Sequence, residues 1–157
     1  TMSVVPNSQE RVVFLSIKPE YAEAILDGSK PYEYRPQPPV AGVPFTMLLY
    51  ATDGVSEVVG AALVDDVKRA DPKDLIPATV HDTPHDADEV RAYFDGTTSG
   101  AALHVRHAVR LEPPIERTEI RERWPDFTVP QNFRYVSEDS HAGLVELTRT
   151  RLNTNHG

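Results

Sequence analysis

The sequence predicts an α+β fold: a small mixed β-barrel flanked by short helices, with a further helix at the C-terminal end. Apolar and β-branched runs of strand length are separated by turns rich in proline and glycine. The helical patterns between them are short and do not alternate regularly with strands, as βαβ units would require. The length of 157 residues, with 39% apolar and 25% charged side chains, is that of one globular domain.

The chain is organised around a strand, a short helix and a second strand near its beginning. Residues 12–18 form an apolar, β-branched run that predicts a largely buried strand. Pro19 suits the first position of a helix, where its missing N–H has no partner to lose. Gly28 should end that helix, because a residue without Cβ adopts the left-handed conformation cheaply.

The second strand is unusually rich in ionisable side chains. In an extended segment, Tyr32 and Tyr34 point to one face, while Glu33 and Arg35 point to the other. Lys30 lies at the turn just before them. We therefore expect a charged cluster at the start of this strand.

The middle of the chain predicts strands and short helices. Residues 37–44, with three prolines, form a surface loop; strands are expected over 45–51 and 57–67, and Gly60 suggests a bulge or a close backbone approach. A helical turn over 71–75, capped by Asp71, should end at Pro77, and residues 77–86 form a loop. A helix over 87–94 follows, capped by Asp86 and stopped by Gly96.

A strand over 101–111 is expected to stop at Pro113 and Pro114. Strict alternation would place Leu103, Val105, His107 and Val109 on one of its faces. The last elements are a helix over 118–124, a strand over 132–136 and a helix over 137–153. The predicted stripe of this final helix contains Leu144, Leu147, Thr148, Arg151 and Leu152.

Four short motifs in order resemble one known family. They are Ser-Ile-Lys-Pro at 16–19, Gly-x-Lys-x-x-Glu-x-Arg at 28–35, Leu-Tyr-Ala-Thr at 49–52 and Pro-Gln-Asn-Phe-Arg-Tyr at 130–135. This set resembles the ASCH domain of the PUA-like superfamily. The resemblance implies a PUA-like mixed β-barrel with a cleft that handles RNA, nucleotides or modified nucleosides.

The resemblance also suggests how the chain is divided. We expect residues 1–11 to form a flexible lead, 12–136 the ASCH domain and 137–157 a C-terminal helical extension. No apolar run approaches the roughly 20 residues that a membrane helix requires. Cysteine is absent, which excludes disulfides and Cys-ligated zinc. We expect a cytoplasmic protein with no membrane partner, and the oligomeric state stays open.

The net charge of −8 argues against nonspecific coating of a phosphate backbone. The charge is uneven, since residues 53–95 carry 11 acidic and 4 basic side chains. The segments that resemble the family are therefore close to neutral. The acidic segment also fits a plain solubilising role.

Lys30 and Glu33 are the candidate catalytic residues. A partly desolvated lysine near Arg35 loses its proton more easily, and a neighbouring carboxylate can exchange that proton. In related amidohydrolases that act on acetylated cytidine, the resemblance implies a lysine at this position and a threonine three residues later. Glu33 occupies that place here, so the hydroxyl nucleophile is missing. The alternative is an ion-pair cluster that only orients the strand.

Further side chains are candidates for ligand binding. Lys18 lies beside a helix N-terminus, where anions are favoured, and with Arg134 it would frame a phosphate pocket. Arg35 would line the same cleft. Tyr50 and Tyr135 would stack on a base or belong to the core. Gln131 and Asn132 would read a base edge or satisfy loop backbone groups.

The six histidines do not predict a metal site, and no cofactor is expected. Pro84 separates His81 from His85, so a shared helical face is excluded. His104 and His107 fall three apart in a predicted strand and should point to opposite faces. No metal-binding motif of the His-Glu-x-x-His type occurs.

Three functions fit these observations. The first is an RNA- or nucleotide-binding protein with a charged cleft around the Gly-x-Lys-x-x-Glu-x-Arg motif. The second is a metal-independent ribonuclease or modified-nucleoside hydrolase that uses Lys30 and Glu33. The third is a partner-binding module in transcriptional regulation, in which the acidic segment 53–95 and the last helix make the contact.

Overall fold

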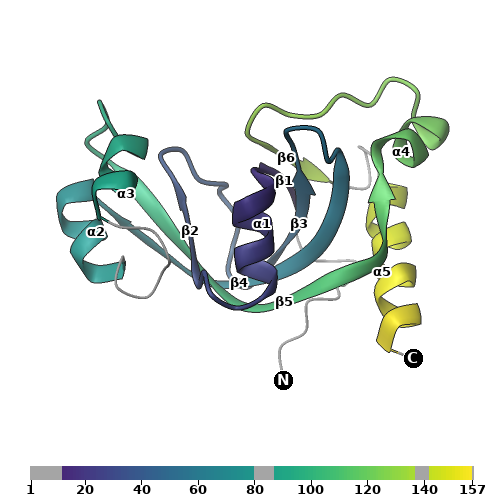
Figure 1. Ribbon diagram of the computed structural model, residues 1–157, viewed down its shortest axis with the longest axis horizontal. Coiled ribbons are helices and arrows are strands. Elements are labelled where there is room, and N and C mark those ends of the chain that lie inside the picture. The colour runs from purple at the N-terminus through teal and green to yellow at the C-terminus, as the bar shows by residue number, and fades with distance from the viewer. Residues whose placement is uncertain (1–11, 80–86, 137–141, 157) are drawn as a thin grey trace.

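The computed structural model, described for residues 12–79, 87–136 and 142–156, contains a six-stranded sheet that curves into a half-barrel (Figure 1). This confirms the predicted α+β class. The strand order is β2-β5-β4-β3-β1-β6, with β1 and β3 parallel and all other neighbours antiparallel. The strands are β1 (Val12–Ile17), β2 (Tyr32–Arg35), β3 (Phe45–Ala51), β4 (Glu57–Ala70), β5 (Gly100–Glu116) and β6 (Phe133–Val136).

Five helices in the described residues surround this sheet. They are α1 (Pro19–Leu26), α2 (Pro72–Thr79), α3 (Ala87–Tyr93), α4 (Arg117–Arg123) and α5 (Ala142–His156). None of them is long and apolar enough to cross a membrane. The predicted lead, the cap at Asp86 and the expected start of the last helix at Ser137 lie outside the described residues.

Both faces of the sheet are buried at β1, where all six residues are buried. Its residues alternate between two apolar clusters, so that Val13 and Leu15 pack with Ile25 of α1. Val12 and Phe14 point to the opposite face. There they join a cluster that includes Ile120 of α4 and the buried α5 residues Leu144 and Leu152.

The predicted close approach at Gly60 is confirmed. A Cβ atom at this position would lie 2.6 Å from Cδ2 of Leu26 and 2.7 Å from the carbonyl oxygen of Val109. The pairing of β4 with β5 also shifts register between Val58 and Gly60. This glycine therefore allows α1 to lie directly on the sheet. Gly28 ends α1 with a φ of +87°, as expected.

A third, smaller apolar cluster joins α2 and α3 to β2. Tyr34 packs against Phe94, with ring centroids 6.1 Å apart, and its hydroxyl donates to Thr79 Oγ1 at 2.9 Å. Leu75 and Val90 complete the contact. As a result, α3 and α1 stand on either side of β2 (Figure 1).

Two proline predictions are wrong. Pro77 does not end α2, which continues to Thr79 because Ile76 and Thr79 are buried while the Pro77 ring is exposed. Pro113 and Pro114 do not end β5. The pairs Gly60–Arg110 and Val58–Ile115 place both prolines in a bulge, where no ladder hydrogen bond is required of them.

The predicted alternation along β5 is also wrong. Leu63 pairs with His107 and Val64 pairs with Val105, so Arg106 is an extra residue in the ladder. The inserted residue reverses the faces beyond it. Consequently Val105 packs on the α1 side of the sheet, while Val109 packs on the other.

Candidate functional site

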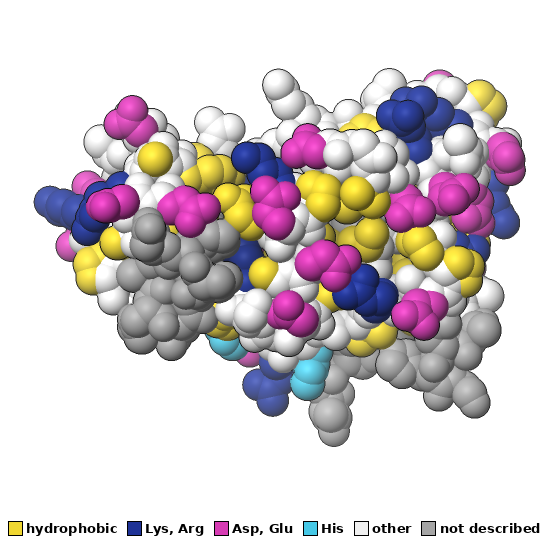
Figure 2. Space-filling model, in the orientation of Figure 1, with side chains coloured by type: hydrophobic (Ala, Val, Ile, Leu, Met, Phe, Trp, Pro, Cys, Tyr) yellow, Lys and Arg dark blue, Asp and Glu magenta, His cyan; other side chains and the backbone are white. Residues whose placement is uncertain are grey.

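A cleft of about 260 Å³ opens where α1, β2 and α3 meet the ends of β1 and β3. Its walls include cationic, anionic and aromatic side chains from segments far apart in the sequence. Apolar side chains gather on the surface between the α3 end of the molecule and its centre, with charged side chains at their margin (Figure 2). Predicted residues that line the cleft are Lys18, Lys30, Glu33, Arg35 and Gln131.

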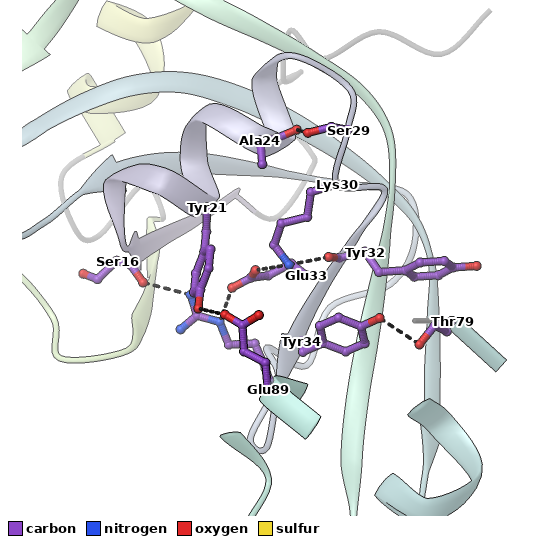
Figure 3. Close-up of polar contacts among 11 residues, drawn as sticks. Ser16, Tyr21, Ala24, Ser29, Lys30, Tyr32, Glu33, Tyr34, Thr79 and Glu89 are labelled. Carbon is purple, nitrogen blue, oxygen red and sulfur yellow. Dashed lines mark hydrogen bonds and ion pairs between the residues drawn. The ribbon is translucent and has the colours of Figure 1, made fainter. Parts of the chain in front are cut away.

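Lys30 is the most unusual of these residues, because only 2% of it is exposed. Its Nζ donates to the backbone oxygen of Tyr32 at 2.7 Å and lies 3.3 Å from Oε1 of Glu33. The same atom lies 5.4 Å from the ring centroid of Tyr21 and 5.0 Å from that of Tyr34. The ammonium is thus held between two aromatic rings, which favour a cation (Figure 3).

Burial lowers the pKa of Lys30 below its usual value. The positive charge of Arg35 acts in the same direction, while Glu33 opposes the shift by its charge and hydrogen bond. Lys30 therefore loses its proton at a lower pH than an exposed lysine does. This is the property expected of a lysine that exchanges a proton.

Glu33 and Arg35 share a face of β2, as predicted. Arg35 Nε donates to Oε2 of Glu33 at 2.8 Å, and both side chains are buried. The guanidinium also donates to Oδ1 of Asn132 and, at 2.9 Å, to the backbone oxygen of Ser16. Because its nitrogens are directed at protein acceptors, Arg35 fixes the orientation of Glu33.

The opening and closing motifs meet at this network. Ser16 Oγ donates to the backbone oxygen of Pro130 at 2.7 Å, and Ser16 N–H donates to the backbone oxygen of Asn132 at 3.0 Å. These bonds place Gln131 at the cleft wall. Asn132 itself serves the Arg35 network rather than the lining.

Besides Asn132, three predicted binding residues do not line the cleft, namely Tyr50, Arg134 and Tyr135. Arg134 pairs with Phe14 across β1 and β6, where its guanidinium covers the Phe127 ring at 5.5 Å. Tyr50 is 2% exposed, and its ring packs 5.3 Å from that of Phe14. Strand alternation turns Arg134 to the face of the sheet opposite α1, so it does not join Lys18.

Tyr135 connects β6 to a loop. Its hydroxyl accepts from the N–H of Val40 at 2.7 Å and donates to the carbonyl oxygen of the same residue at 3.1 Å. These two bonds attach β6 to the loop over 37–44. The side chain therefore holds a loop near the cleft without lining it.

Sequence reasoning missed the α3 side of the cleft and one residue of α1. Glu89 and Tyr93 lie one helical turn apart on α3, and both line the cleft. The α1 residue is Tyr21, whose hydroxyl donates to Oε1 of Glu89 at 3.4 Å. Burial, aided by the charge of Glu89, raises the pKa of Tyr21. No local motif marks these residues, because only the fold brings them to Lys30.

Charged side chains of both signs lie on the face shown in Figure 2, and the described histidines were also considered as metal ligands. Acidic and basic side chains are interspersed over the face shown in Figure 2. Within the described part of the chain, no three side chains of the His, Cys, Asp and Glu types gather closely enough to hold a metal ion. His81 and His85 lie outside that part.

Known proteins resemble this chain in sequence and in fold. No family model matches it. The ASCH domain-containing ribonuclease of Zymomonas mobilis subsp. mobilis is 28% identical over 147 residues, which are 94% of this chain and 97% of that protein.

Solved structures give a consistent picture. The crystal structure of ASCH from Zymomonas mobilis has a TM-score of 0.78 at 26% identity, covering 87% of this chain and 94% of that one. The N-terminal domain of Staphylothermus marinus McrB, at 9% identity, has a TM-score of 0.52 over 95% of this chain and 98% of that one, a likeness of fold alone. The sequence relative, the crystal structures and the ordered motifs agree that this chain is similar to ASCH domain proteins in both sequence and fold.

Proposed function

We propose that this protein binds single-stranded RNA in the cleft and cleaves it by general acid–base chemistry without a metal ion. The observation that carries the proposal is Lys30, a buried lysine of lowered pKa held against Glu33 beside an open cleft. The name of the similar Zymomonas mobilis protein, a ribonuclease, supports RNA as the substrate.

The reaction that suits these groups is attack of a ribose 2′-hydroxyl on the adjacent phosphorus. Neutral Lys30 takes the 2′-OH proton as the bond from the 2′-oxygen to phosphorus forms, and Glu33 stabilises the resulting ammonium. The bond from phosphorus to the 5′-oxygen breaks, and that oxygen needs a proton. Tyr93 is the cleft tyrosine that we assign as the donor, since the Tyr21 hydroxyl is directed at Glu89 and the Tyr34 hydroxyl at Thr79.

The cleft also suits an isolated nucleotide unit better than a duplex. Its volume of about 260 Å³ and its aromatic walls match a splayed-out base, the usual target in single-stranded RNA. Lys18 lies at the N-terminal end of α1, where helix N–H groups favour a phosphate. The RNA strand would therefore enter with its phosphate near α1.

A second candidate is RNA binding without cleavage. The bonds of Lys30 to Tyr32 and Glu33 favour the charged ammonium, which would then hold a phosphate rather than remove a proton. Hydrolysis of a modified nucleoside in the manner of the amidohydrolases is less well supported, because Glu33 stands where the resemblance implies threonine.

The test is degradation of an end-labelled single-stranded RNA in excess chelator, with direct measurement of binding. We expect cleavage by the wild type, loss of cleavage in Lys30→Met and strong reduction in Glu33→Gln. Lys68→Met is the matched control, because this lysine is 44% exposed, pairs with Asp66 and does not line the cleft. Replacement of the attacked 2′-hydroxyl by hydrogen should stop cleavage.

Each outcome separates the candidates. Tight binding of intact RNA, weakened by Lys30→Met, supports the binder and contradicts the enzyme. RNA that is neither bound nor cleaved contradicts both. Cleavage that Lys30→Met leaves unchanged contradicts the role of this cleft.

A further inference from the structure

The α3 side of the cleft holds a carboxylate that the cleavage step does not require and, beside it, an aromatic ring. Glu89 and Tyr93 lie on successive turns of α3, and both line the cleft, as do Lys18 and Tyr21 on the α1 side. One offers a carboxylate and the other an aromatic ring. A carboxylate beside an aromatic face is an arrangement suited to a nucleobase, because the base can stack on the ring while its edge meets the carboxylate.

The orientation of Glu89 is set by its neighbour across the cleft. Tyr21 donates its hydroxyl to Oε1 of Glu89 at 3.4 Å, and the carboxylate is turned toward Tyr21 (Figure 3). The raised pKa of Tyr21 keeps this hydroxyl protonated, so it remains a donor. Each carboxylate oxygen has two acceptor positions, and an ionised carboxylate offers no donor. Glu89 therefore selects for hydrogen-bond donors on a ligand.

Tyr93 supplies a surface on which a flat ligand can lie. Its ring centroid is 5.5 Å from that of Phe94 at an interplanar angle of 76°, so an edge contact with a buried residue holds it in place. Tyr93 is nevertheless 49% exposed at the cleft. Stacking of a base on such a ring contributes affinity regardless of the identity of the base.

We propose that Glu89 makes the cleft selective for guanine, with Tyr93 as the stacking surface. The Watson–Crick edge of guanine presents two adjacent donors, the N1–H and the 2-amino group, which match the two oxygens of one carboxylate. Adenine and cytosine present one amino donor beside a ring nitrogen that is an acceptor. Uracil presents one N–H between two carbonyl oxygens, both of which a carboxylate repels.

This inference rests on the proposed function, because it assigns the base to an RNA bound in the same cleft. The proposed binding mode uses side chains of opposite charge on the two sides of the cleft. The phosphate lies on the α1 side with Lys18, and the base edge lies on the α3 side with Glu89. Lys30 and Glu33 lie between these two sides, just before β2 and within it. The inference thus predicts sequence preference from side chains that lie outside the ASCH-like motifs.

The experiment compares four single-stranded RNAs that differ only in one central nucleotide, guanosine, adenosine, cytidine or uridine. Binding and cleavage are both measured for each, and a fifth RNA carries inosine, which lacks the 2-amino group. We expect guanosine to be preferred by roughly tenfold or more, since a good two-bond contact discriminates by about that factor. Inosine should lose much of this preference.

The informative readout is the ratio between bases, because a merely structural defect would lower all rates together. Glu89→Gln should bring the guanosine preference close to one. Asp88→Asn is the matched control, since its carboxyl is 93% exposed and pairs with Arg91 outside the cleft lining. Tyr93→Leu should weaken binding of all five RNAs while keeping their order, and Tyr93→Phe should restore that binding.

Equal binding and cleavage of all four bases, or a guanosine preference that survives Glu89→Gln, would overturn the inference while leaving the proposed function standing. Failure of every RNA to bind would instead remove the proposed function itself. A preference for adenosine or cytidine that Glu89→Gln abolishes would keep Glu89 as the reader but overturn the assignment to guanine.

Discussion

The Nζ atom of Lys30 lies 3.3 Å from Oε1 of Glu33, and the two side chains are only 2% and 5% exposed. Arg35 contacts the other oxygen of the same carboxylate at 2.8 Å. The Glu33 carboxylate is therefore the counter-charge of two buried cations, Lys30 and Arg35. Removing that anion should cost far more than breaking an ion pair on the surface.

Glu33→Gln should lower the free energy of unfolding by about 3–5 kcal/mol, the range for breaking a buried pair. The physical reason is that Lys30 and Arg35 would remain buried without their counter-charge. Urea unfolding at neutral pH measures the effect. Asp66→Asn, which breaks the exposed pair with Lys68, should cost less than about 1 kcal/mol. Equal costs for the two variants would show that the buried cluster is not stabilising.

The rate of RNA cleavage should rise with pH, because Lys30 acts as a base only when it is deprotonated. Burial lowers its pKa, so this limb should be centred below the usual lysine value of 10.5. Glu33 raises the pKa of Lys30, and its replacement by glutamine should move the limb to lower pH. A pH–rate profile of both enzymes tests the assignment. A limb that Glu33→Gln does not move would argue that another group titrates.

Gly60→Ala should destabilise the protein by about 1–3 kcal/mol, the cost of inserting a methyl group into a packed core. The new Cβ would lie 2.7 Å from the Val109 carbonyl oxygen, a backbone atom that cannot rotate away. Thermal or urea unfolding measures the change. Gly42→Ala is the control, since a Cβ there meets nothing within 4 Å. If both variants unfold alike, α1 does not lie as closely on β4 as described.

Leu152→Ala should cost about 2–5 kcal/mol, because this side chain is fully buried in the cluster shared by α4, α5 and the sheet. Glu146→Ala, on an exposed position of the same helix, should cost less than about 1 kcal/mol. Chemical denaturation of both variants provides the comparison. A neutral effect at Leu152 would mean that α5 is a dispensable extension.

Local signals predicted most elements correctly. The helix between Pro19 and Gly28, the shared face of Glu33 and Arg35, and the close approach at Gly60 each follow from the chemistry of one or two residues. The prolines at 113 and 114 misled the prediction because a bulge removed the ladder bonds that they cannot make. Such a bulge depends on the partner strand and has no signature in β5 alone.

The sequence predicted part of the cleft lining, namely Lys18, Lys30, Glu33, Arg35 and Gln131, but nothing of its α3 side. Lys30, Glu33 and Arg35 form a cluster because strand alternation and one turn bring them together. Three other side chains resemble ligand-binding residues in the sequence but are directed elsewhere by the sheet. Arg134 lies on the opposite face, Tyr50 lies in the core, and Tyr135 binds a loop. Glu89 and Tyr93 reach the cleft because α3 packs on Tyr34.

The sequence by itself determined the strand–helix–strand unit and the charged cluster, since hydrophobic periodicity, proline and glycine act over a few residues. Only the tertiary structure decided which distant side chains face that cluster and how far Lys30 is withdrawn from water. The reason is that burial and the pKa shift it causes depend on packing between segments, here α1, β2 and α3, and no single segment contains that information.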